Sequence, residues 1–379
     1  MSTATNKSPR TDWTVLVPVV ALVALVFSWG RDLPGLAVVL VSLCLAGAVL
    51  AAVHHAEVVA LRVGEPFGSL VLAVAVTVIE VALIVTLMAD GGDKTASLAR
   101  DTVFAAVMIT CNGIVGLSLL VGALRNRVAV FNAEGSGAAL ATVATLAVLS
   151  LVLPTFTTSK PGPEFSAAQL TFAAVASLAL YGLFIAVQTV RHRDYFLPVD
   201  THRIRREAAR AAAAAAAGED EDHAEPPTAR AAHISLGLLL VALVAVVGNA
   251  KAVSPTIEEG VARAGLPNAV VGVIIALLVL LPETLAAVRA ARRDRVQTSL
   301  NLAYGSAIAS IGLTIPAIAL ASIWMSGPLL LGLGPVHMVL LTLTIVVSAL
   351  TIVPGRATLL QGGVHLVLFA AFLFLAVSP

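Results

Sequence analysis

Charged residues are scarce in this chain of 379 residues. Only 12% of the residues are Asp, Glu, Lys or Arg, about half of the roughly 25% that is typical of soluble globular domains. Hydrophobic residues make up 59%, and the mean hydropathy is +0.97. A 38.7 kDa chain with this balance is not a water-soluble enzyme with one large core. The composition predicts a polytopic membrane protein, and a net charge of +1 points to no nucleic-acid partner.

Cysteine and the motifs of enzymes are also lacking. Cys44 and Cys111 are the only cysteines and both lie in apolar runs, so neither a disulfide framework nor a zinc site is indicated. The sequence contains no Walker loop and no nucleophile elbow, so we expect no enzymatic activity and no bound cofactor. The N-terminus turns apolar at Trp13 without a clear cleavage motif, which favours a first transmembrane helix over a signal peptide.

Long apolar runs are abundant, and each is near the ~20 residues that cross a bilayer. We expect eleven spans, at 13–29, 34–56, 68–89, 102–124, 136–156, 166–190, 234–252, 268–288, 296–323, 333–353 and 358–377. With a cytoplasmic N-terminus, 17 Lys and Arg fall in cytoplasmic segments and 6 in outer segments. This asymmetry predicts a multi-pass protein of the cell (inner) membrane with its C-terminus outside.

A polar linker at 191–232 separates the sixth and seventh spans. Its first half is basic, and its second half is an alanine run that ends in GEDEDHAE. One interpretation is a solvated cytoplasmic helix and tail without a specific role. The other is a regulatory or cation-attracting acidic segment.

Two glutamates stand alone in apolar spans. Glu80 is the only charged residue between Ser69 and Met88, and Glu283 is the only one between Asn268 and Val288. A lone carboxylate at mid-bilayer depth is costly unless it has a partner, a proton or a cation. A structural role, in which each protonated carboxyl bonds across a helix interface, is the alternative to cation binding.

The two glutamate spans belong to matching parts of the sequence. Each is followed by an uncharged span rich in small residues, in which Gly116-Leu117-Ser118 aligns with Gly312-Leu313-Thr314. Spans two to six and seven to eleven therefore look like two five-helix repeats, and the odd number gives them opposite orientations. Inverted repeats are typical of transporters whose sites lie where the repeats meet near the midplane. We expect Glu80 and Glu283 to share one central cation and proton site.

The expected architecture is an all-α polytopic membrane protein with about eleven transmembrane helices. It consists of one N-terminal helix followed by two inverted five-helix repeats. The expected parts are the N-terminal tail and first helix at 1–32, the first repeat at 33–190, the linker at 191–232 and the second repeat at 233–379.

Oxygen ligands lie near both glutamates in the sequence. Thr77 is three residues before Glu80 and so on the same helix face. Pro282 has no N–H, which frees the carbonyl of Leu278 to act as a ligand, although a packing kink alone is an equal alternative.

A polar stripe runs along the span after Glu283. Ser306, Ser310 and Thr314 recur every four residues, and Asn112 is the matching candidate in the first half. Such stripes usually mean close helix packing or hydroxyl bonds to backbone carbonyls. Because these residues neighbour the glutamate spans, we take Asn112, Ser306 and Ser310 as candidate ion-path residues.

Histidines gather at the cytoplasmic end of the second span, in the sequence HHAE. His54, His55 and Glu57 are a candidate proton relay there. A plain interfacial charge cluster is the alternative, and their spacing matches no known zinc motif. His337 and His365 are lone histidines in apolar spans, for which satisfied packing is expected.

Several segments resemble one family of transporters. HHAEVVALRVGEPFGSLVLAVAVTVIEVALIV, LARDTVF and LLPETLAAVRAARRDRVQTSLNLAYGSAIASIGLTIP are similar to bacterial ChaA-type calcium/proton antiporters of the calcium/cation antiporter superfamily. The resemblance implies that Ca²⁺ is exchanged for protons by alternating access, with the essential acids at Glu80 and Glu283. The chain departs from the superfamily's Gly-Asn-Ala-x-Glu pattern, having Thr77-Val78-Ile79 and Leu280-Leu281-Pro282 before the glutamates. This departure leaves the carbonyl and amide ligands unassigned.

The expected function is secondary antiport of cytoplasmic Ca²⁺ against H⁺, and the expected partners are inorganic cations, protons and the lipid bilayer. A Na⁺(K⁺)/H⁺ antiporter that uses the same carboxylates is the first alternative, because this branch of the superfamily is also associated with monovalent exchange. A cation channel is an alternative of another class, and flux that persists without a proton gradient would distinguish it.

Overall fold

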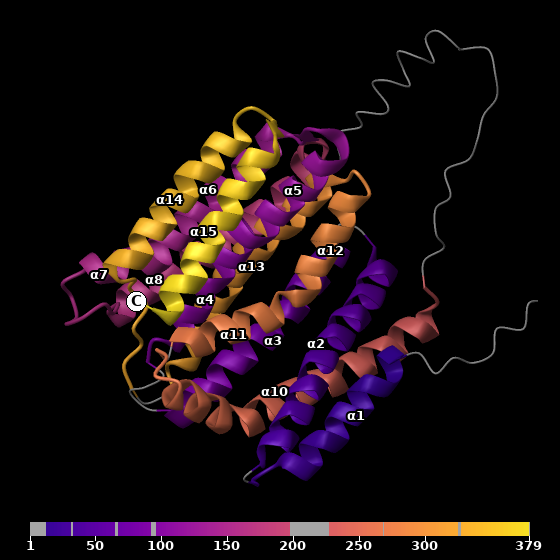
Figure 1. The fold of residues 1–379 in the computed structure, drawn as a ribbon, viewed down its shortest axis with the longest axis vertical. Helices are drawn as coiled ribbons and strands as arrows, with labels where there is room; N and C mark the ends of the chain where they lie inside the picture. Colours follow the sequence, from indigo (N-terminus) through magenta and orange to yellow (C-terminus); the bar gives the residue numbers. More distant parts are fainter. Residues whose placement is uncertain are drawn as a thin grey trace, which may run out of the picture. The chain divides into compact units, whose positions relative to one another are not determined.

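The part of the chain that the structure describes is almost entirely helical, and the fold divides into two units (Figure 1). Unit 1 comprises Met1–Asp90 and Pro227–Gly265, and unit 2 comprises Gly91–Pro226 and Leu266–Pro379. The computed structural model describes residues 13–31, 33–64, 67–91, 96–197, 227–267, 269–324 and 327–378. The expected N-terminal tail and residues 198–226 of the expected linker lie outside the described residues.

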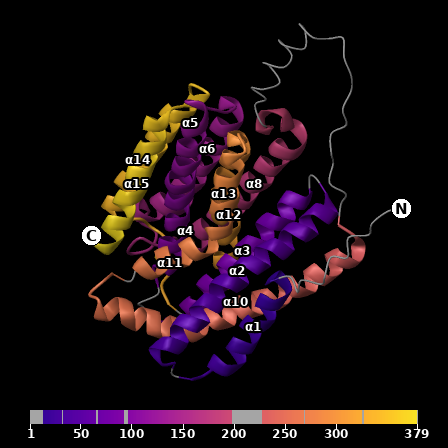
Figure 2. The same cartoon turned by 45° about the vertical axis from the view of Figure 1, so that its right-hand side comes forward.

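Among the described residues, unit 1 contains four helices (Figures 1 and 2). The four are α1 (Trp13–Ser28), α2 (Gly35–Val63), α3 (Phe67–Gly91) and α10 (Ala229–Arg263). Helices α1, α2 and α10 are in mutual contact. Gly248 permits the approach of α10 to α1, because a Cβ there would lie 2.4 Å from the side chain of Leu25. Beside it, Asn249 Nδ2 donates to the carbonyl of Ala21 over 2.8 Å, so an amide inside an apolar span joins two helices.

Unit 2 contains the remaining elements. They are α4 (Leu98–Met108), η2 (Ile109–Ile114), α5 (Val115–Asn126), β1 (Ala129–Val130), α6 (Ala133–Ala147), η3 (Val148–Val152), α7 (Leu153–Phe156), α8 (Ala167–Ala186), η4 (Val187–Arg191), η5 (Arg193–Phe196), α11 (Ala269–Val279), α12 (Leu281–Arg292), α13 (Val296–Ala321), α14 (Pro335–Ile352), β2 (Arg356–Ala357) and α15 (Leu359–Val377). The continuous span α4–η2–α5 and the helix α13 are its most buried parts.

One end of unit 2 gathers three segments that are far apart in the sequence. Leu330 N donates to Ala96 O, and Gly332 N donates to Pro163 O, each over 3.0 Å. All three segments are expected on the outer side of the membrane.

The opposite end of unit 2 gathers segments that are expected on the cytoplasmic side. There β1 pairs antiparallel with β2, and Asn126 Nδ2 donates to Asp294 Oδ1 over 2.6 Å. Within unit 2 the connecting segments therefore alternate between two ends as the sequence predicts. As a result, α4–η2–α5 and α13 run in opposite directions. Which end faces the cytoplasm stays a prediction.

The two central spans of unit 2 each pack on a helix from the other half of the sequence. Gly116 of α5 lies against α15, where a Cβ would be 3.1 Å from the carbonyl of Gly362. Gly312 of α13 lies against α8, where a Cβ would be 2.8 Å from Tyr181 Cβ. Each third helix of an expected repeat thus packs on the fifth helix of the other. This reciprocal pattern is what a two-fold relation between repeats would produce, and the repeat boundaries themselves stay a prediction.

The multi-span helical class is confirmed. Among the described residues, eight helical segments are long and apolar enough to cross a membrane, and the bent pair of α11 and α12 makes a ninth. Helix α1 and the Val74–Met88 part of α3 are apolar but shorter. Every expected span coincides with helix, while the count of eleven crossings stays a prediction.

Among the described residues of unit 2, π-helical turns lie within two spans, at η2 and η3, and end a third span, at η4. The first lies midway along α4–η2–α5 and is fully buried. In it, Thr110 Oγ1 donates to the carbonyl of Ala106 over 2.7 Å, which satisfies the hydroxyl locally. Wide turns of this kind are frequent at functional sites.

Candidate functional site

Glu80 lies within α3 and is almost completely buried. Its exposed fraction is 4%, and that of Thr77, one turn earlier, is 6%. The two side chains therefore share the buried face of α3, as their spacing predicts. This face presents a carboxylate and a hydroxyl together, which are both oxygen donors of the kind that hard cations prefer.

Glu283 lies in the first turn of α12, directly after a break in the helix. Helices α11 and α12 meet at Leu280 with a bend of 50°. Pro282 explains the bend, because it cannot donate to the carbonyl of Leu278 and its ring crowds the preceding turn. Thr284 continues the ladder, with its N and its Oγ1 both donating to the carbonyl of Leu280, over 2.9 and 2.7 Å. The predicted kink is confirmed, and the role of the Leu278 carbonyl as a ligand stays a prediction.

Pro282→Ala is expected to reduce this bend and to slow transport roughly tenfold, because it restores the N–H donor and moves Glu283. The bend is measurable as the distance between spin labels on exposed positions, Ile274 of α11 and Leu285 of α12. Straightening should lengthen that distance relative to the labelled wild type. An unchanged distance would show that packing, and not the proline, sets the bend.

Asn112 lies in the buried π-helical turn η2, where it is fully enclosed. Its Nδ2 donates to Thr344 Oγ1 of α14 over 2.9 Å. Its Oδ1 accepts from His365 Nδ1 of α15 over 3.2 Å. His365 Nε2 then accepts from Thr351 Oγ1, also over 3.2 Å, which is the pairing available to a neutral ring. All four side chains have exposed fractions of 3% or less.

This polar chain satisfies His365 at both ring nitrogens, as expected for a packed histidine. It also occupies the Asn112 amide with partners from α14 and α15. The assignment of Asn112 to the ion path stays a prediction. The partners of Asn112 are 232 and 253 residues away in the sequence.

His365→Phe should destabilise the fold by about 1–3 kcal/mol, because it leaves the Asn112 and Thr351 oxygens buried without their partner. Thermal unfolding in detergent measures this loss. His337→Phe is the control, because that ring is half-buried and lies against Phe104 at 4.8 Å between centroids. Equal losses in both variants would mean that the polar chain contributes nothing specific.

The polar stripe on α13 is buried along most of its length. Ser310 is 3% exposed and Thr314 is fully buried, while Ser306 is half-buried. Thr314 Oγ1 is buried without a hydrogen-bond partner among the described residues. Buried hydroxyls are normally paired, so Thr314 is an exception among the described residues. The assignment of Ser306 and Ser310 to the ion path stays a prediction.

The proposed relay residues lie near the end of α2 in unit 1. His55 is 3% exposed, and its Nε2 donates to the carbonyl of Thr14 over 2.9 Å, because a carbonyl only accepts. His54 is half-buried and lies edge-on to His55 with ring centroids 5.5 Å apart, while Glu57 is exposed. His55 therefore joins α2 to α1. A role in proton relay stays a prediction.

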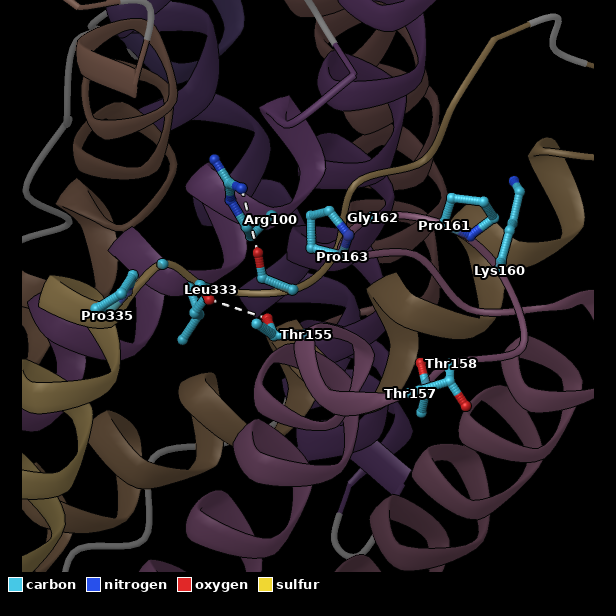
Figure 3. Close-up of a pocket in the computed structure, with 12 residues that line it drawn as sticks. Arg100, Thr155, Thr157, Thr158, Lys160, Pro161, Gly162, Pro163, Leu333 and Pro335 are labelled. Atoms are coloured by element: carbon cyan, nitrogen blue, oxygen red, sulfur yellow. Dashed lines mark hydrogen bonds between the residues drawn. The ribbon is translucent and has the colours of Figure 1, made fainter.

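A pocket of about 580 Å³ opens at the end of unit 2 where the segments near Ala96, Pro163 and Gly332 meet (Figure 3). Arg100 and Lys160 line it, and both are neutralised. Arg100 Nε lies 2.8 Å from Asp101 Oδ1, and Lys160 pairs with Glu164. Arg100 also donates to the carbonyl of Gly332 over 3.2 Å. Among the described residues that line the pocket there is no carboxylate, so the pocket offers no anionic ligand to a cation.

Glu80 belongs to unit 1 and Glu283 to unit 2, and their pairing stays a prediction. Among the described residues, no cluster of three or more His, Cys, Asp or Glu side chains could hold a metal ion. The sequence does not predict the polar partners Thr344 and Thr351 or the amide of Asn249 that joins two helices. The available signal for Asn249 was its position as a lone amide in an apolar run.

The sequence of this chain matches the model of a known protein family. The family described as sodium/calcium exchanger protein matches residues 11–190 and 234–378. The chain belongs to that family. The sodium/calcium exchanger family is one of transporters, so the chain is a multi-pass membrane cation antiporter of the calcium/cation antiporter superfamily and not an enzyme.

Relatives of the exchanger cover almost the whole chain. The ionic transporter y4hA of Sinorhizobium fredii is 45% identical over 374 residues, which are 97% of this chain and 96% of the relative. The sodium-potassium/proton antiporter ChaA of Escherichia coli is 33% identical over 371 residues, with the same two coverages. The Ca²⁺/H⁺ antiporter of Aphanothece halophytica is 23% identical over 335 residues, which are 85% of this chain and 86% of the relative.

A solved structure shares the fold. The structure of native YfkE superposes with a TM-score of 0.69 at 14% identity, covering 97% of this chain and 99% of that one. The chain therefore shares the fold of that structure. The expected resemblance to the calcium/cation antiporter superfamily is confirmed.

Proposed function

We propose that this exchanger is a proton-coupled antiporter that moves a cytoplasmic cation, chiefly Ca²⁺, against H⁺ by alternating access. Glu80 and Glu283 form its shared cation and proton site. The observation that carries this proposal is the position of Glu283 at the break between α11 and α12. Broken helices with free backbone carbonyls are where transporters bind ions.

Competition between cation and proton supplies the coupling. Two carboxylates removed from water hold protons, since burial favours the neutral form. A cation that brings two positive charges displaces those protons, and re-protonation on the other side releases the cation. The pairing of the glutamates rests on their matched positions in the two sequence repeats. The burial of Glu80 at 4% exposure supports the desolvation on which the competition depends.

Charge matching favours Ca²⁺ as the first substrate candidate. Two ionised glutamates balance one divalent ion and supply at most four oxygens. The remaining ligands of the roughly 6–8 that Ca²⁺ takes would be hydroxyls, carbonyls and water. Thr77, on the buried face of α3, is the first candidate for such a hydroxyl.

Sodium or potassium is the second substrate candidate, and a relative favours it. The Escherichia coli protein that is 33% identical is named a sodium-potassium/proton antiporter, whereas the relative named for calcium is 23% identical. A monovalent ion needs only one ionised carboxylate. Under this alternative one glutamate would be less critical than the other.

Cation-driven proton movement in inverted vesicles tests the proposal. Ca²⁺, Na⁺ and K⁺ are added separately to vesicles with a preformed proton gradient, at pH 7, 8 and 9. Collapse of the gradient by Ca²⁺ alone supports the first candidate, and collapse by Na⁺ or K⁺ supports the second. Cation flux that continues without a proton gradient would indicate a channel and overturn the proposal.

A further inference from the structure

Two buried serines connect three helices of unit 2. Ser118 of α5 and Ser299 of α13 are both fully buried. Ser299 Oγ lies 2.5 Å from Ser118 Oγ and 2.8 Å from the carbonyl oxygen of Ala287 in α12. Ser118 Oγ lies 2.7 Å from the carbonyl oxygen of Ile114. The two hydroxyls thus form a continuous polar contact from α5 to α12.

The helix at the end of this contact carries Glu283. Ala287 follows Glu283 by one helical turn and is fully buried. Helix α12 is short, begins at the bend and ends at the tight connection to α13. The hydroxyl of Ser299 therefore bonds the side of α12 one helical turn after Glu283.

The two serine hydroxyls have two protons to donate but make three contacts at hydrogen-bond distance. Each hydroxyl donates one hydrogen bond and accepts up to two, while three contacts are present: Ile114 with Ser118, Ser118 with Ser299, and Ser299 with Ala287. In the first arrangement Ser118 donates to Ser299, which donates to Ala287. In the second, Ser299 donates to Ser118, which donates to Ile114. Both arrangements make two hydrogen bonds, and of these two only the first holds α12. A third, in which each hydroxyl donates to its carbonyl, would leave the two Oγ atoms 2.5 Å apart with no proton between them, which is repulsive.

We propose that Ser118 and Ser299 are positioning residues for Glu283, which hold α12 in the first proton arrangement and release it in the second. Because the number of hydrogen bonds is the same, α12 can shift without leaving a buried hydroxyl unpaired. Rotation of two hydroxyl groups is sufficient, and no covalent bond or net charge changes. This inference rests on the proposed function of Glu283 as a cation ligand.

Opposite kinetic effects follow for the two alanine variants. In Ser118→Ala, the Ser299 proton has only Ala287 O as its acceptor, so α12 stays attached and kcat should fall about threefold to tenfold with KM unchanged or lower. In Ser299→Ala, the carbonyl of Ala287 loses the hydroxyl that donates to it, and α12 is held less firmly. The expected result is a KM for the cation that is about threefold to tenfold higher, with a smaller change in kcat.

Matched controls come from a second buried serine pair. Ser150 of η3 and Ser177 of α8 lie 3.3 Å apart and are both fully buried, and in the described part of the chain neither η3 nor α8 packs extensively on α12. Ser150→Ala and Ser177→Ala should leave both kinetic constants within twofold of wild type. Hydrogen–deuterium exchange of the α12 amides gives a readout that does not depend on transport, and it should slow in Ser118→Ala and quicken in Ser299→Ala.

The experiment measures cation-driven proton movement for the four serine variants beside Glu283→Gln, each normalised to folded protein. A kcat loss in Ser118→Ala and a KM rise in Ser299→Ala, with the matching exchange changes, support the inference. Parallel effects in both variants, or effects equal to those of the controls, overturn it while leaving the role of Glu283 intact if Glu283→Gln is inactive. Normal exchange by Glu283→Gln overturns the proposed function, and this inference with it.

Discussion

Glu80→Gln and Glu283→Gln are each expected to reduce cation-driven proton movement to the background of protein-free vesicles. Glutamine keeps the size of the side chain but cannot ionise, so it removes one unit of negative charge and one exchangeable proton. With one carboxylate missing, a divalent ion would be left with a net positive charge in a low-dielectric site, which is strongly unfavourable. The measurement is dequenching of a pH-sensitive dye after addition of Ca²⁺, Na⁺ or K⁺.

Glu164→Gln is the control for this prediction. Glu164 is also buried, at 7% exposure, but it pairs with Lys160 beside the pocket, at the end of unit 2 opposite the connection between α12 and α13. Its variant should keep most of the exchange activity. If it were as inactive as Glu80→Gln, the loss would reflect general damage to a buried carboxylate. If Glu80→Gln alone were active, the site would be a single-carboxylate site that suits a monovalent ion.

The second large effect is expected at the contact of α5 with α15. A Cβ at Gly362 would lie 2.8 Å from the backbone N of Leu120 and 3.1 Å from the carbonyl of Gly116. Both obstacles are backbone atoms, which cannot rotate away as a side chain can. Gly362→Val should therefore cost about 3 kcal/mol or more, a large part of the about 5–15 kcal/mol stability of a typical fold. The yield of monodisperse protein and the unfolding temperature in detergent measure this loss.

The neighbouring glycine provides the control for that substitution. Gly363 lies one residue further along α15, and a Cβ there would meet no atom within 4 Å. Both variants have the same helix propensity, so their difference isolates the helix contact. Gly363→Val should express and unfold like wild type. Equal behaviour of the two variants would show that α5 and α15 do not approach as closely as the structure has them.

Sequence predicted the helices wherever apolar residues alone decide them. It placed the ends less well where polar residues extend a helix. Helix α10 runs to Arg263, well past the expected end at 252, because pairs at i and i+4 stabilise its polar turns. Ser254 Oγ donates to Glu258 Oε1 over 2.7 Å, and Arg263 pairs with Glu259 over 2.6 Å. Hydropathy does not register such pairs.

The candidate site was predictable in part, for a similar reason. Lone glutamates in apolar runs are visible in the sequence because their desolvation is costly, and the bend at Pro282 follows from its missing N–H. The π-helical turn at Ile109–Ile114 has no such local signal. Polar contacts between helices that are distant in the sequence could not be predicted either. Ser118 and Ser299, for example, are 181 residues apart and meet only in the folded chain.

The measurement that tests the central claim most directly is the number of protons released when a cation binds. Ca²⁺ is titrated calorimetrically into the purified protein, in buffers that differ in ionisation enthalpy, beside Glu80→Gln and Glu283→Gln. The account predicts that wild type releases protons on binding, that its apparent affinity rises with pH as protons leave, and that each variant loses the release. Tight cation binding without proton release, or release that persists in both variants, would contradict a site shared by cation and proton.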